Sequence, residues 1–272
     1  MKKKTSFLLW LLAFVLTVIL AVYQRMSGPT YPLRGRQDIS GAEVKFKLYR
    51  SWTSYSSLPV RLQAKAGGLR VRLHHRRFPF IPNENWAVMD MKNKDGVFEG
   101  AIPGEPAAGK VAYKVEVLDR GESSWLNRGL PVVARFKGEV PAWLLIAHIL
   151  FMFAGLLLAF RTGLGALFKD DRWQRLVPWT LGVTAVGGLI MGPLVQKYAF
   201  GAYWTGFPLG GDLTDSKTLF AILFWVAAFL LRKKSRWWTV TATVLMVAVY
   251  LIPHSMLGSE LDYKTGQVIT AK

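Results

Sequence analysis

The sequence predicts a membrane protein in two parts: an all-β sandwich domain outside the membrane and an α-helical transmembrane bundle. The first observation is compositional. The chain of 272 residues has 35 Lys+Arg against 17 Asp+Glu, a net charge of +18, yet 51% of its residues are apolar. A soluble nucleic-acid-binding protein can carry such a charge but seldom that apolar fraction. The second observation is that the apolar residues gather in five long runs, while the stretch between the first two runs alternates apolar and polar residues.

The first apolar run extends from Phe7 to Val22, directly after three lysines. Its length suits either a tilted membrane span or a signal peptide. A signal-peptide cleavage site needs small residues at its −3 and −1 positions, and Ala21-Val22-Tyr23 places a tyrosine there. We therefore interpret residues 1–22 as an uncleaved transmembrane anchor. Residues 23–40, rich in glycine and proline, are predicted to be a linker.

Four further apolar runs predict a four-helix transmembrane bundle over residues 140–253. The runs are Pro141–Phe160, Leu176–Val195, Thr218–Leu231 and Trp237–Pro253. The run from Thr218 is short, but Lys217 and Arg232 at its ends can extend their charged groups toward water. A long loop at 196–217 joins the second and third of these helices. With the anchor, the sequence predicts five spans in total.

The basic residues between the spans predict the orientation. Lysines precede the first span, a basic loop occupies 161–175, and the loop at 232–236 reads Arg-Lys-Lys-Ser-Arg. With five spans all three basic segments fall on one side, which the positive-inside rule assigns to the cytoplasm. The sequence therefore predicts a multi-pass protein of the bacterial inner membrane. Its N-terminus is cytoplasmic, and residues 23–139 and the tail at 254–272 are extracytoplasmic.

Residues 41–139 carry the pattern of a β-sandwich domain. Apolar and polar residues alternate in several short segments separated by turns, notably at Asn93–Gly96 and Gly104–Gly109. Seven short strands with frequent turn signals are typical of an antiparallel sandwich. The predicted strands are 44–48, 60–62, 69–73, 86–91, 97–102, 111–118 and 131–136.

One segment of this domain suggests its type. The stretch Ala101-Ile102-Pro103-Gly104-Glu105-Pro106, followed by Gly109-Lys110-Val111-Ala112-Tyr113, resembles the end of an immunoglobulin-like or fibronectin-III-like domain. The resemblance covers about 95 residues and implies a sandwich of that type. Folds of this kind serve many functions, so the resemblance implies no particular one.

The densest basic region of the sequence lies within the predicted β domain. It comprises Arg61, Arg70, Arg72, Arg76 and Arg77, with His74 and His75 among them. One interpretation is a patch that binds anionic lipid headgroups or an acidic envelope protein. The other is that arginines simply occupy the solvent face of the strands, where alternation places them. Nucleic acid is not expected as a partner, because the predicted topology puts this region outside the cell.

Polar residues on the predicted spans mark the one place where we expect chemistry. His148 and His254 both belong to the outer leaflet, on faces of small or polar residues that should turn into the bundle. We expect the two histidines to lie near one another, with Tyr250 beside them. The outer loop and the tail bring further groups to the same side. The full candidate site is His148, Tyr250, His254, Trp204, Asp212, Asp215, Glu260 and Asp262.

This outer-face site leaves several interpretations open. The histidines can make structural hydrogen bonds between helices, act as axial ligands of a b-type haem, or bind a metal ion with a carboxylate such as Asp212, Asp215 or Glu260. Trp204 and its aromatic neighbours can cap a pocket or form an interfacial belt. Asp215 with Ser216 is expected to be the N-cap of the following helix.

Motifs that are missing from the sequence restrict the function. The chain has no cysteine, which excludes disulfides, Cys-bound zinc and iron–sulfur clusters. It also has no P-loop, dinucleotide fingerprint, H-E-x-x-H or nucleophile elbow, so no enzyme class is predicted. The leading hypothesis is a non-enzymatic envelope protein with a binding, scaffold or complex-assembly role. The alternatives are a membrane redox subunit that uses haem or quinone, and a small-solute carrier.

Overall fold

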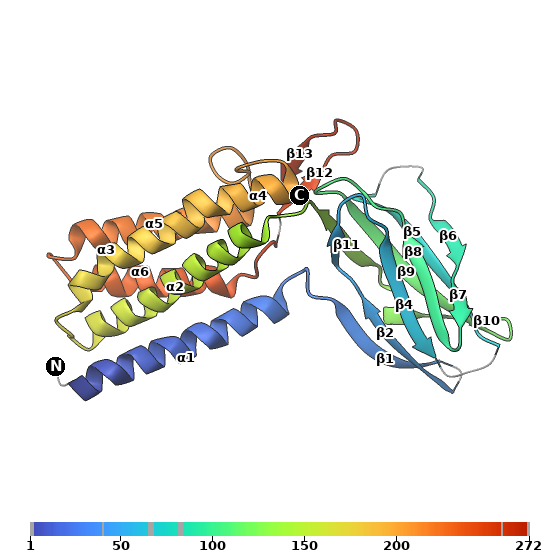
Figure 1. The fold of residues 1–272 in the computed structure, drawn as a ribbon, viewed down its shortest axis with the longest axis horizontal. Helices are drawn as coiled ribbons and strands as arrows, with labels where there is room; N and C mark the ends of the chain where they lie inside the picture. Colours follow the sequence, from blue (N-terminus) through green and yellow to red (C-terminus); the bar gives the residue numbers. More distant parts are fainter. Residues whose placement is uncertain (1–2, 40, 65–67, 81–83, 257, 271–272) are drawn as a thin grey trace. The chain divides into compact units, whose positions relative to one another are not determined.

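The computed structural model describes residues 3–39, 41–64, 68–80, 84–256 and 258–270 (Figure 1). The chain forms two compact units. The helical unit comprises Met1–Pro29, Val140–Ser259 and Thr270–Lys272. The β unit comprises Thr30–Glu139 and Glu260–Ile269.

The β unit is built from two sheets. The first sheet has the order β1-β2-β4-β8-β7, and the second has the order β3-β11-β9-β5-β6, with β10 paired to β9. The strands are β1 Leu33–Ile39, β2 Ala42–Leu48, β3 Ser51–Thr53, β4 Leu58–Ala64, β5 Arg70–Phe78, β6 Ala87–Asp90, β7 Lys92–Lys94, β8 Val97–Ile102, β9 Lys110–Asp119, β10 Glu122–Trp125 and β11 Val132–Lys137. A short helical turn, η1 (Leu126–Gly129), follows β10. Among the residues that the structure describes, the strand pairs of these two sheets are antiparallel except that of β11 with β3.

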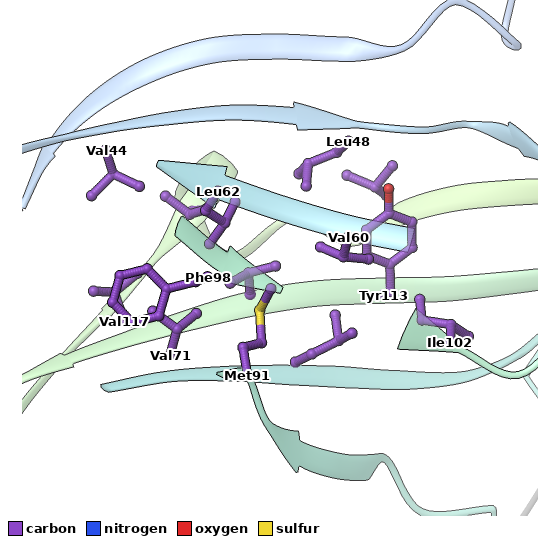
Figure 2. Close-up of a cluster of buried hydrophobic side chains, with 14 of the residues drawn as sticks. Val44, Leu48, Val60, Leu62, Val71, Met91, Phe98, Ile102, Tyr113 and Val117 are labelled. Atoms are coloured by element: carbon purple, nitrogen blue, oxygen red, sulfur yellow. The ribbon is translucent and has the colours of Figure 1, made fainter. Parts of the chain in front are cut away.

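One hydrophobic core fills the space between these sheets (Figure 2). Along β4, Leu58, Val60, Leu62 and Ala64 are buried in strict alternation, which is the pattern of a strand with one face on a core. The second sheet contributes Val71, Val117 and other inward side chains of β5 and β9 to the same cluster. Each of the seven predicted strand ranges overlaps a strand, and the two-sheet arrangement is that of a β-sandwich.

The predicted linker at 23–40 is wrong for much of its length. Helix α1 (Lys3–Ser27) extends past residue 22, and β1 begins at Leu33 as an edge strand of the first sheet. The inward positions of β1 include Gly35 and Gln37, so the strand lacks a run of large apolar residues that would mark it in the sequence. Gly35 pairs with Phe46, whose ring would lie 2.6 Å from a Cβ at this position. The aromatic ring therefore covers the glycine across the strand pair.

The C-terminal tail also has more structure than predicted. Strands β12 (Ser259–Leu261) and β13 (Val268–Thr270) pair with each other. Residues 260–269 belong to the β unit, where Leu261 N donates to Ala108 O at 3.0 Å. The Tyr263 hydroxyl accepts from Lys110 N at 3.0 Å and donates to Lys110 O at 2.9 Å. The tail at 254–272 is thus partly a component of the β fold.

The helical unit contains the predicted apolar segments with shifted ends. Its helices are α1, α2 Ala142–Leu167, α3 Trp173–Ala185, α4 Gly192–Phe200, α5 Leu213–Leu231 and α6 Trp237–Leu251. A π-helical turn, η2 (Val186–Met191), makes α3, η2 and α4 continuous over 173–200. Four helices in the described residues are long and apolar enough to cross a membrane, and α6 is shorter. Because α4 ends at Phe200, the predicted 196–217 loop contracts to residues 201–212.

Small residues hold these helices close together. A Cβ added to Gly155 would lie 2.6 Å from Thr184 Oγ1, and one added to Gly163 would overlap Thr243. Thr162 and Thr180 share a hydrogen bond of 3.0 Å between their hydroxyls. Close backbone approach over glycine and threonine is typical of helix packing in membranes.

Candidate functional site

His148 lies on α2 beside the π-helical turn. Its Nδ1 is 3.0 Å from Gly187 O, and because a carbonyl only accepts, the imidazole N–H is the donor. The ring is half-buried. This bond joins α2 to η2, as the structural interpretation of the histidine predicts, and it fixes the tautomer in which Nε2 carries the lone pair.

Tyr250 and His254 have partners of their own. The Tyr250 hydroxyl donates to Met152 O at 3.1 Å and so joins α6 to α2. The His254 side chain is exposed, its Nδ1 lies 2.9 Å from Ser255 Oγ, and its backbone N–H donates to Gln24 Oε1 at 3.1 Å. None of these hydrogen bonds joins one histidine to the other. The expected His148–His254 pair therefore stays a prediction.

Asp212 and Asp215 do come together, around Thr205. Asp212 Oδ2 accepts from Ser259 N at 2.9 Å and from Thr205 Oγ1 at 3.3 Å. Asp215 Oδ2 accepts from Thr205 N at 2.8 Å and from Gly206 N at 3.1 Å. The Asp215 carboxylate thus binds the backbone of the 201–212 loop to the start of α5, and the Asp212 carboxylate joins the Thr205 side chain to Ser259.

The predicted N-cap of α5 is wrong by one turn. Asp212 is the cap, and its Oδ1 accepts from Thr214 N at 2.8 Å and from Asp215 N at 3.4 Å. The helix begins at Leu213, so Asp215 lies inside its first turn and bonds back to the loop. Trp204, the aromatic candidate, uses its Nε1 to donate to Phe207 O at 3.1 Å within the same loop.

Glu260 and Asp262 do not join these acids. Glu260 Oε2 lies 2.7 Å from Lys110 Nζ in the β unit. Burial lowers the pKa of Lys110, although the Glu260 carboxylate opposes that shift. Asp262 accepts from Lys264 N and Thr265 Oγ1, both at 2.9 Å, and so closes the turn between β12 and β13. Among the described residues there is no group of three His, Asp or Glu side chains that could hold a metal ion.

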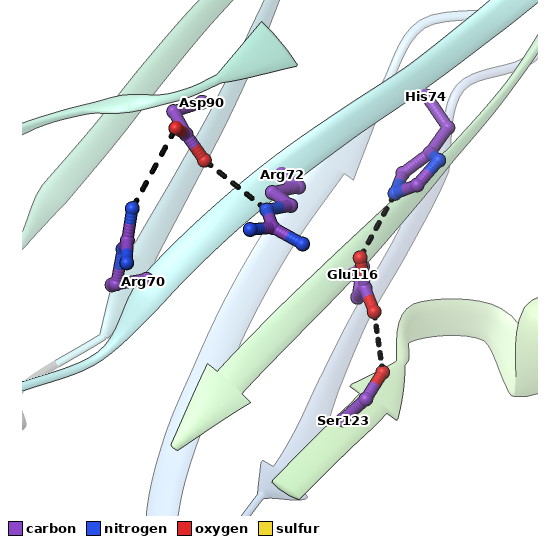
Figure 3. A network of polar contacts seen from close by, with 6 residues as sticks. All are labelled: Arg70, Arg72, His74, Asp90, Glu116 and Ser123. Atoms are coloured by element: carbon purple, nitrogen blue, oxygen red, sulfur yellow. Dashed lines mark hydrogen bonds and ion pairs between the residues drawn. The ribbon is translucent and has the colours of Figure 1, made fainter. Parts of the chain in front are cut away.

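The arginines of the basic region come from both sheets, and Arg61 lines the same pocket as Asp90, the partner of Arg70 and Arg72. Arg61 lies on β4 of the first sheet, where its Nε is 2.9 Å from Glu99 Oε1. The other four arginines lie on β5 of the second sheet. Arg70 and Arg72 both pair with Asp90, at 3.7 and 3.3 Å (Figure 3).

Most of this basic charge is neutralised by neighbouring acids. Arg77 Nε is 3.1 Å from Glu105 Oε1, a hydrogen bond that raises the pKa of Arg77. On the same strand, His74 Nε2 lies 3.0 Å from Glu116 Oε2, and Ser123 donates to the other oxygen of Glu116 at 2.6 Å (Figure 3). The hydrogen bond from Ser123, followed by that from His74, lowers the pKa of Glu116. The five arginines are therefore poor evidence for a uniform anion-binding patch.

A different feature of the second sheet was not predicted from the sequence. Its outer face carries a group that we call the ring–cation face, which consists of Arg76, Phe80, Trp86, Lys114 and Trp125. The Arg76 guanidinium lies 3.4 Å from the ring centre of Phe80 and 4.7 Å from that of Trp86. Lys114 Nζ lies 4.8 Å from the ring centre of Trp86 and 4.3 Å from that of Trp125. Trp86 is thus flanked by two cations.

The ring–cation face differs from its surroundings in its charge. Within the part of the chain that the structure describes, Arg76 and Lys114 make no ion pair. Lys114 pairs in register with His74, and Arg76 follows two residues later on the same face of β5. The alternation of Arg76, Phe78 and Phe80 in the sequence could have indicated part of this face. Only the β5–β9 register, however, places Lys114 and Trp125 beside these residues.

Comparisons with known proteins add little to this geometry. No model of a protein family matches the sequence, and no curated protein matches it. Among solved structures, the chain is similar to one titled "Crystal structure of Br derivative BhCBM56", with 10% sequence identity and a TM-score of 0.24 over 39% of this chain and 92% of that chain. A similarity at this TM-score supports no conclusion about fold or function.

Proposed function

We propose that the chain is an integral membrane protein of the bacterial cell envelope, with five spans and an extracytoplasmic β domain of the immunoglobulin or fibronectin-III type. The distribution of apolar residues in the helical unit supports a membrane location. Large side chains such as Phe7, Trp143 and Leu150 are exposed, whereas Gly155 and Thr180 are buried. A lipid environment accounts for such an arrangement, because apolar side chains at the surface of the bundle meet hydrocarbon rather than water.

The fold of the tail supports the number of spans. Residues 30–139 and 260–269 form one compact unit, so both must lie on the same side of a membrane. The chain between them must then cross an even number of times. It contains three helices of spanning length, at 142–167, 173–200 and 213–231, so α6 is the fourth crossing. With 15 residues, α6 is about 22 Å long, short for a bilayer but tolerated with local thinning.

The charges between the helices support the orientation. The described loop at 232–236 carries Arg232, Lys233, Lys234 and Arg236, and the N-terminus carries lysines. The positive-inside rule places these on the cytoplasmic side of the inner membrane. The N-terminus is then cytoplasmic, and the β domain and the C-terminus are extracytoplasmic.

For the molecular role we propose non-enzymatic binding of an anionic partner at the ring–cation face. One observation carries this proposal: Arg76 and Lys114 lie over aromatic rings without an acid partner in the described residues, while the nearby Arg70 and Arg72 share Asp90. The positive charge of this face is thus available to a ligand. Anionic lipid headgroups and an acidic envelope protein both meet the charge requirement. Nucleic acid is not proposed as a partner, because the proposed topology places this face outside the cytoplasm.

The hydrogen bond of His148 favours the redox alternative as a second candidate. A histidine that donates one N–H to a backbone carbonyl leaves its other nitrogen as an acceptor or ligand, as in haem and quinone sites. The absorbance spectrum of the purified chain decides this candidate. A Soret band would favour the redox candidate over the binding role. So would quinone that is extracted in proportion to the native protein but is absent from His148→Leu. The structure offers no comparable observation for a solute carrier.

The topology can be tested with single cysteines, because the native chain has none. Cysteine is placed at Tyr55 or Lys264 of the β unit, at Leu209 of the 201–212 loop, or at Lys234 of the basic loop, all of them exposed. A membrane-impermeant maleimide should label the first three in intact spheroplasts and Lys234→Cys only after permeabilisation. The native chain is the unlabelled control. Labelling of Lys234→Cys in intact spheroplasts would overturn the five-span orientation.

The binding role can be tested with the full chain in neutral nanodiscs. We expect binding to a generic polyanion, polyglutamate, to weaken by about tenfold or more in Arg76→Gln/Lys114→Gln. The matched control is Arg70→Gln/Arg72→Gln, which removes the same charge from the same sheet together with the ion pairs to Asp90. Equal loss in both variants would mean that only total charge matters, and polyglutamate binding that high salt leaves unchanged would reject an interaction based on charge.

A further inference from the structure

The ring–cation face has a shape that its charge alone does not explain. Side chains of β5, β9 and β10 and of the segment that precedes β6 place rings and cations alternately, in the order Trp125, Lys114, Trp86, Arg76, Phe80. Phe78 extends the series, with its ring centre 5.5 Å from that of Phe80. Each cation therefore contacts two aromatic rings on the outer face of the sheet, and the ring centres of Phe80 and Trp86 lie 6.3 Å apart.

The rings of this series are partly open to solvent. Phe80 is 44% exposed, and Trp86 and Trp125 are half-buried. The outward direction follows from the strand register, because Val71, Leu73, Val115 and Val117, which alternate with the outward residues of β5 and β9, lie in the core. Aromatic rings on the solvent face of a sheet do not contribute to the core of this unit, so they need another explanation.

The acids near this face do not compete for its cations. Glu116 is bonded by His74 and Ser123, and Asp90 is shared by Arg70 and Arg72. Residues 23–139 as a whole carry 20 Lys+Arg against 11 Asp+Glu, a difference of +9. The face thus attracts an anion both locally and through the charge of its domain.

A ligand that fits must offer three properties at once. It needs anionic groups for Arg76 and Lys114, flat faces with C–H groups for the rings, and enough length to contact both Trp125 and Phe80 at the two ends of the series. A polypeptide supplies carboxylates but few flat faces, and a lipid headgroup supplies a single phosphate. A chain of pyranose rings that bear carboxylates supplies all three, because each ring has an apolar face and its acid group lies at the edge.

We infer that the ring–cation face binds an acidic polysaccharide, with sugar rings against Trp86, Phe80 and Trp125 and acid groups at Arg76 and Lys114. This inference rests on the proposed anionic partner and names its chemical class. No bond is made or broken, and the interaction is reversible. The stacking contacts provide specificity for a sugar, while the cations provide affinity that salt weakens.

The test compares two polyanions with the full chain in neutral nanodiscs. Polygalacturonate has carboxylates on sugar rings, and polyglutamate has carboxylates without rings. We expect the native chain to bind polygalacturonate about tenfold more tightly, measured per carboxylate. Equal binding of both would leave the anionic-partner proposal standing and overturn the polysaccharide inference, and binding of neither would overturn both. Tighter binding to phosphatidylglycerol vesicles than to either polymer would assign the face to lipid headgroups instead.

Aromatic variants separate stacking from charge. Trp86→Ala/Phe80→Ala should weaken polygalacturonate binding by about tenfold and leave polyglutamate binding within about twofold. Tyr55→Ala, which removes a ring that is 78% exposed and lies outside the ring–cation face, is the matched control and should change neither. Amide exchange across β5 and β9 checks that the variants keep the sheet. Unchanged polygalacturonate binding in a folded Trp86→Ala/Phe80→Ala protein would overturn the stacking role.

Discussion

The two units of the molecule differ in the residues that they expose. In the β unit, Leu62, Phe98 and Phe136 lie in the core, and charged side chains occupy the surface. In the helical unit, Gly163, Thr180 and Arg161 are buried, while large apolar side chains are exposed. The same hydrophobic effect produces both arrangements if water surrounds one unit and lipid the other. The side chains that a unit exposes therefore depend on the solvent around it as well as on its fold.

Arginine illustrates the difference most clearly. Arg70 in the β unit keeps 70% of its side chain exposed and pairs weakly with Asp90. Arg161 in the helical unit has 0% exposure, and its Nη2 donates to Asp170 and, at 3.2 Å, to Ser6 Oγ. Its Nε and Nη1 find no hydrogen-bond partner in the described residues. Removing one partner of such a buried pair is costly, because the remaining charge is left desolvated without a counter-ion.

The largest effect should follow from removing one partner of this pair. Arg161→Ala leaves the Asp170 carboxylate buried without its cation, so we expect the helical unit to lose about 3–5 kcal/mol of unfolding free energy. The loss should appear in the thermal unfolding of the detergent-solubilised chain. The β unit should unfold at an unchanged temperature, since it contains neither residue.

The double substitution Arg161→Met/Asp170→Leu is the matched control, because it removes both charges and should recover most of the loss. The pH dependence provides a second check. Although burial acts to raise the pKa of Asp170, the hydrogen bond from Arg161 and further contacts outweigh it and lower that pKa. The stabilisation is therefore present at neutral pH and is lost as the pH falls through the lowered value. A native helical unit indifferent to acid in this range would contradict the role of the pair.

The next effect belongs to the β unit. Phe98→Ala removes a fully buried ring from the core shared by both sheets, and we expect a loss of about 3–5 kcal/mol confined to that unit. The control, Phe80→Ala, removes a ring from the outer face and should cost much less. Tryptophan fluorescence during unfolding measures both losses. An equally large loss from Phe80→Ala would show that its ring belongs to the core and that the outer face of the second sheet is assigned wrongly.

Close helix packing predicts a smaller effect. Gly163→Ala places a methyl group against the Thr243 side chain, so we expect a loss of about 1–3 kcal/mol in the helical unit. Gly182→Ala is the control, because nothing lies within 4 Å of a Cβ there, and better helix propensity should make it neutral or slightly stabilising. Thermal unfolding of the two variants side by side checks the difference. A neutral Gly163→Ala would mean that α2 and α6 have room to separate.

Much of the fold could be predicted from the sequence, because two strong periodicities carry it. Strict alternation marked β4 and the inner part of β5, and long apolar runs marked the helices. The elements that escaped prediction lack such a pattern. Strand β1 has Gly35 and Gln37 at inward positions, and β12 and β13 have only three residues each. Their pairing depends on distant partners such as Phe46 and Lys110, which no local pattern reveals.

The candidate site was harder to predict, for the same reason. Sequence placed His148, Asp212 and Asp215 at one end of the helices, and the two acids do meet around Thr205. Glu260 is next to Ser259 in sequence, yet Ser259 bonds Asp212 while Glu260 pairs with Lys110. Proximity along the chain therefore could not decide its partner. The ring–cation face could not be predicted from the sequence, because its residues come from separate strands and only the strand register brings them together.

The smallest effect tests the surface charges of the β unit. Arg70→Glu with Arg72→Glu reverses two exposed charges on β5, between which Val71 points into the core. Exposed ion pairs contribute roughly 0–1 kcal/mol each, so the fold should remain intact and the unfolding free energy should fall by no more than about 1–2 kcal/mol, including repulsion from Asp90. High salt should reduce this loss further, whereas it would not rescue a cavity in the core. Denaturant unfolding at low and high salt measures both quantities. A large loss that salt leaves unchanged would mean that these arginines face inward, and the register of β5, with the outward direction of Arg76 that depends on it, would be wrong by one residue.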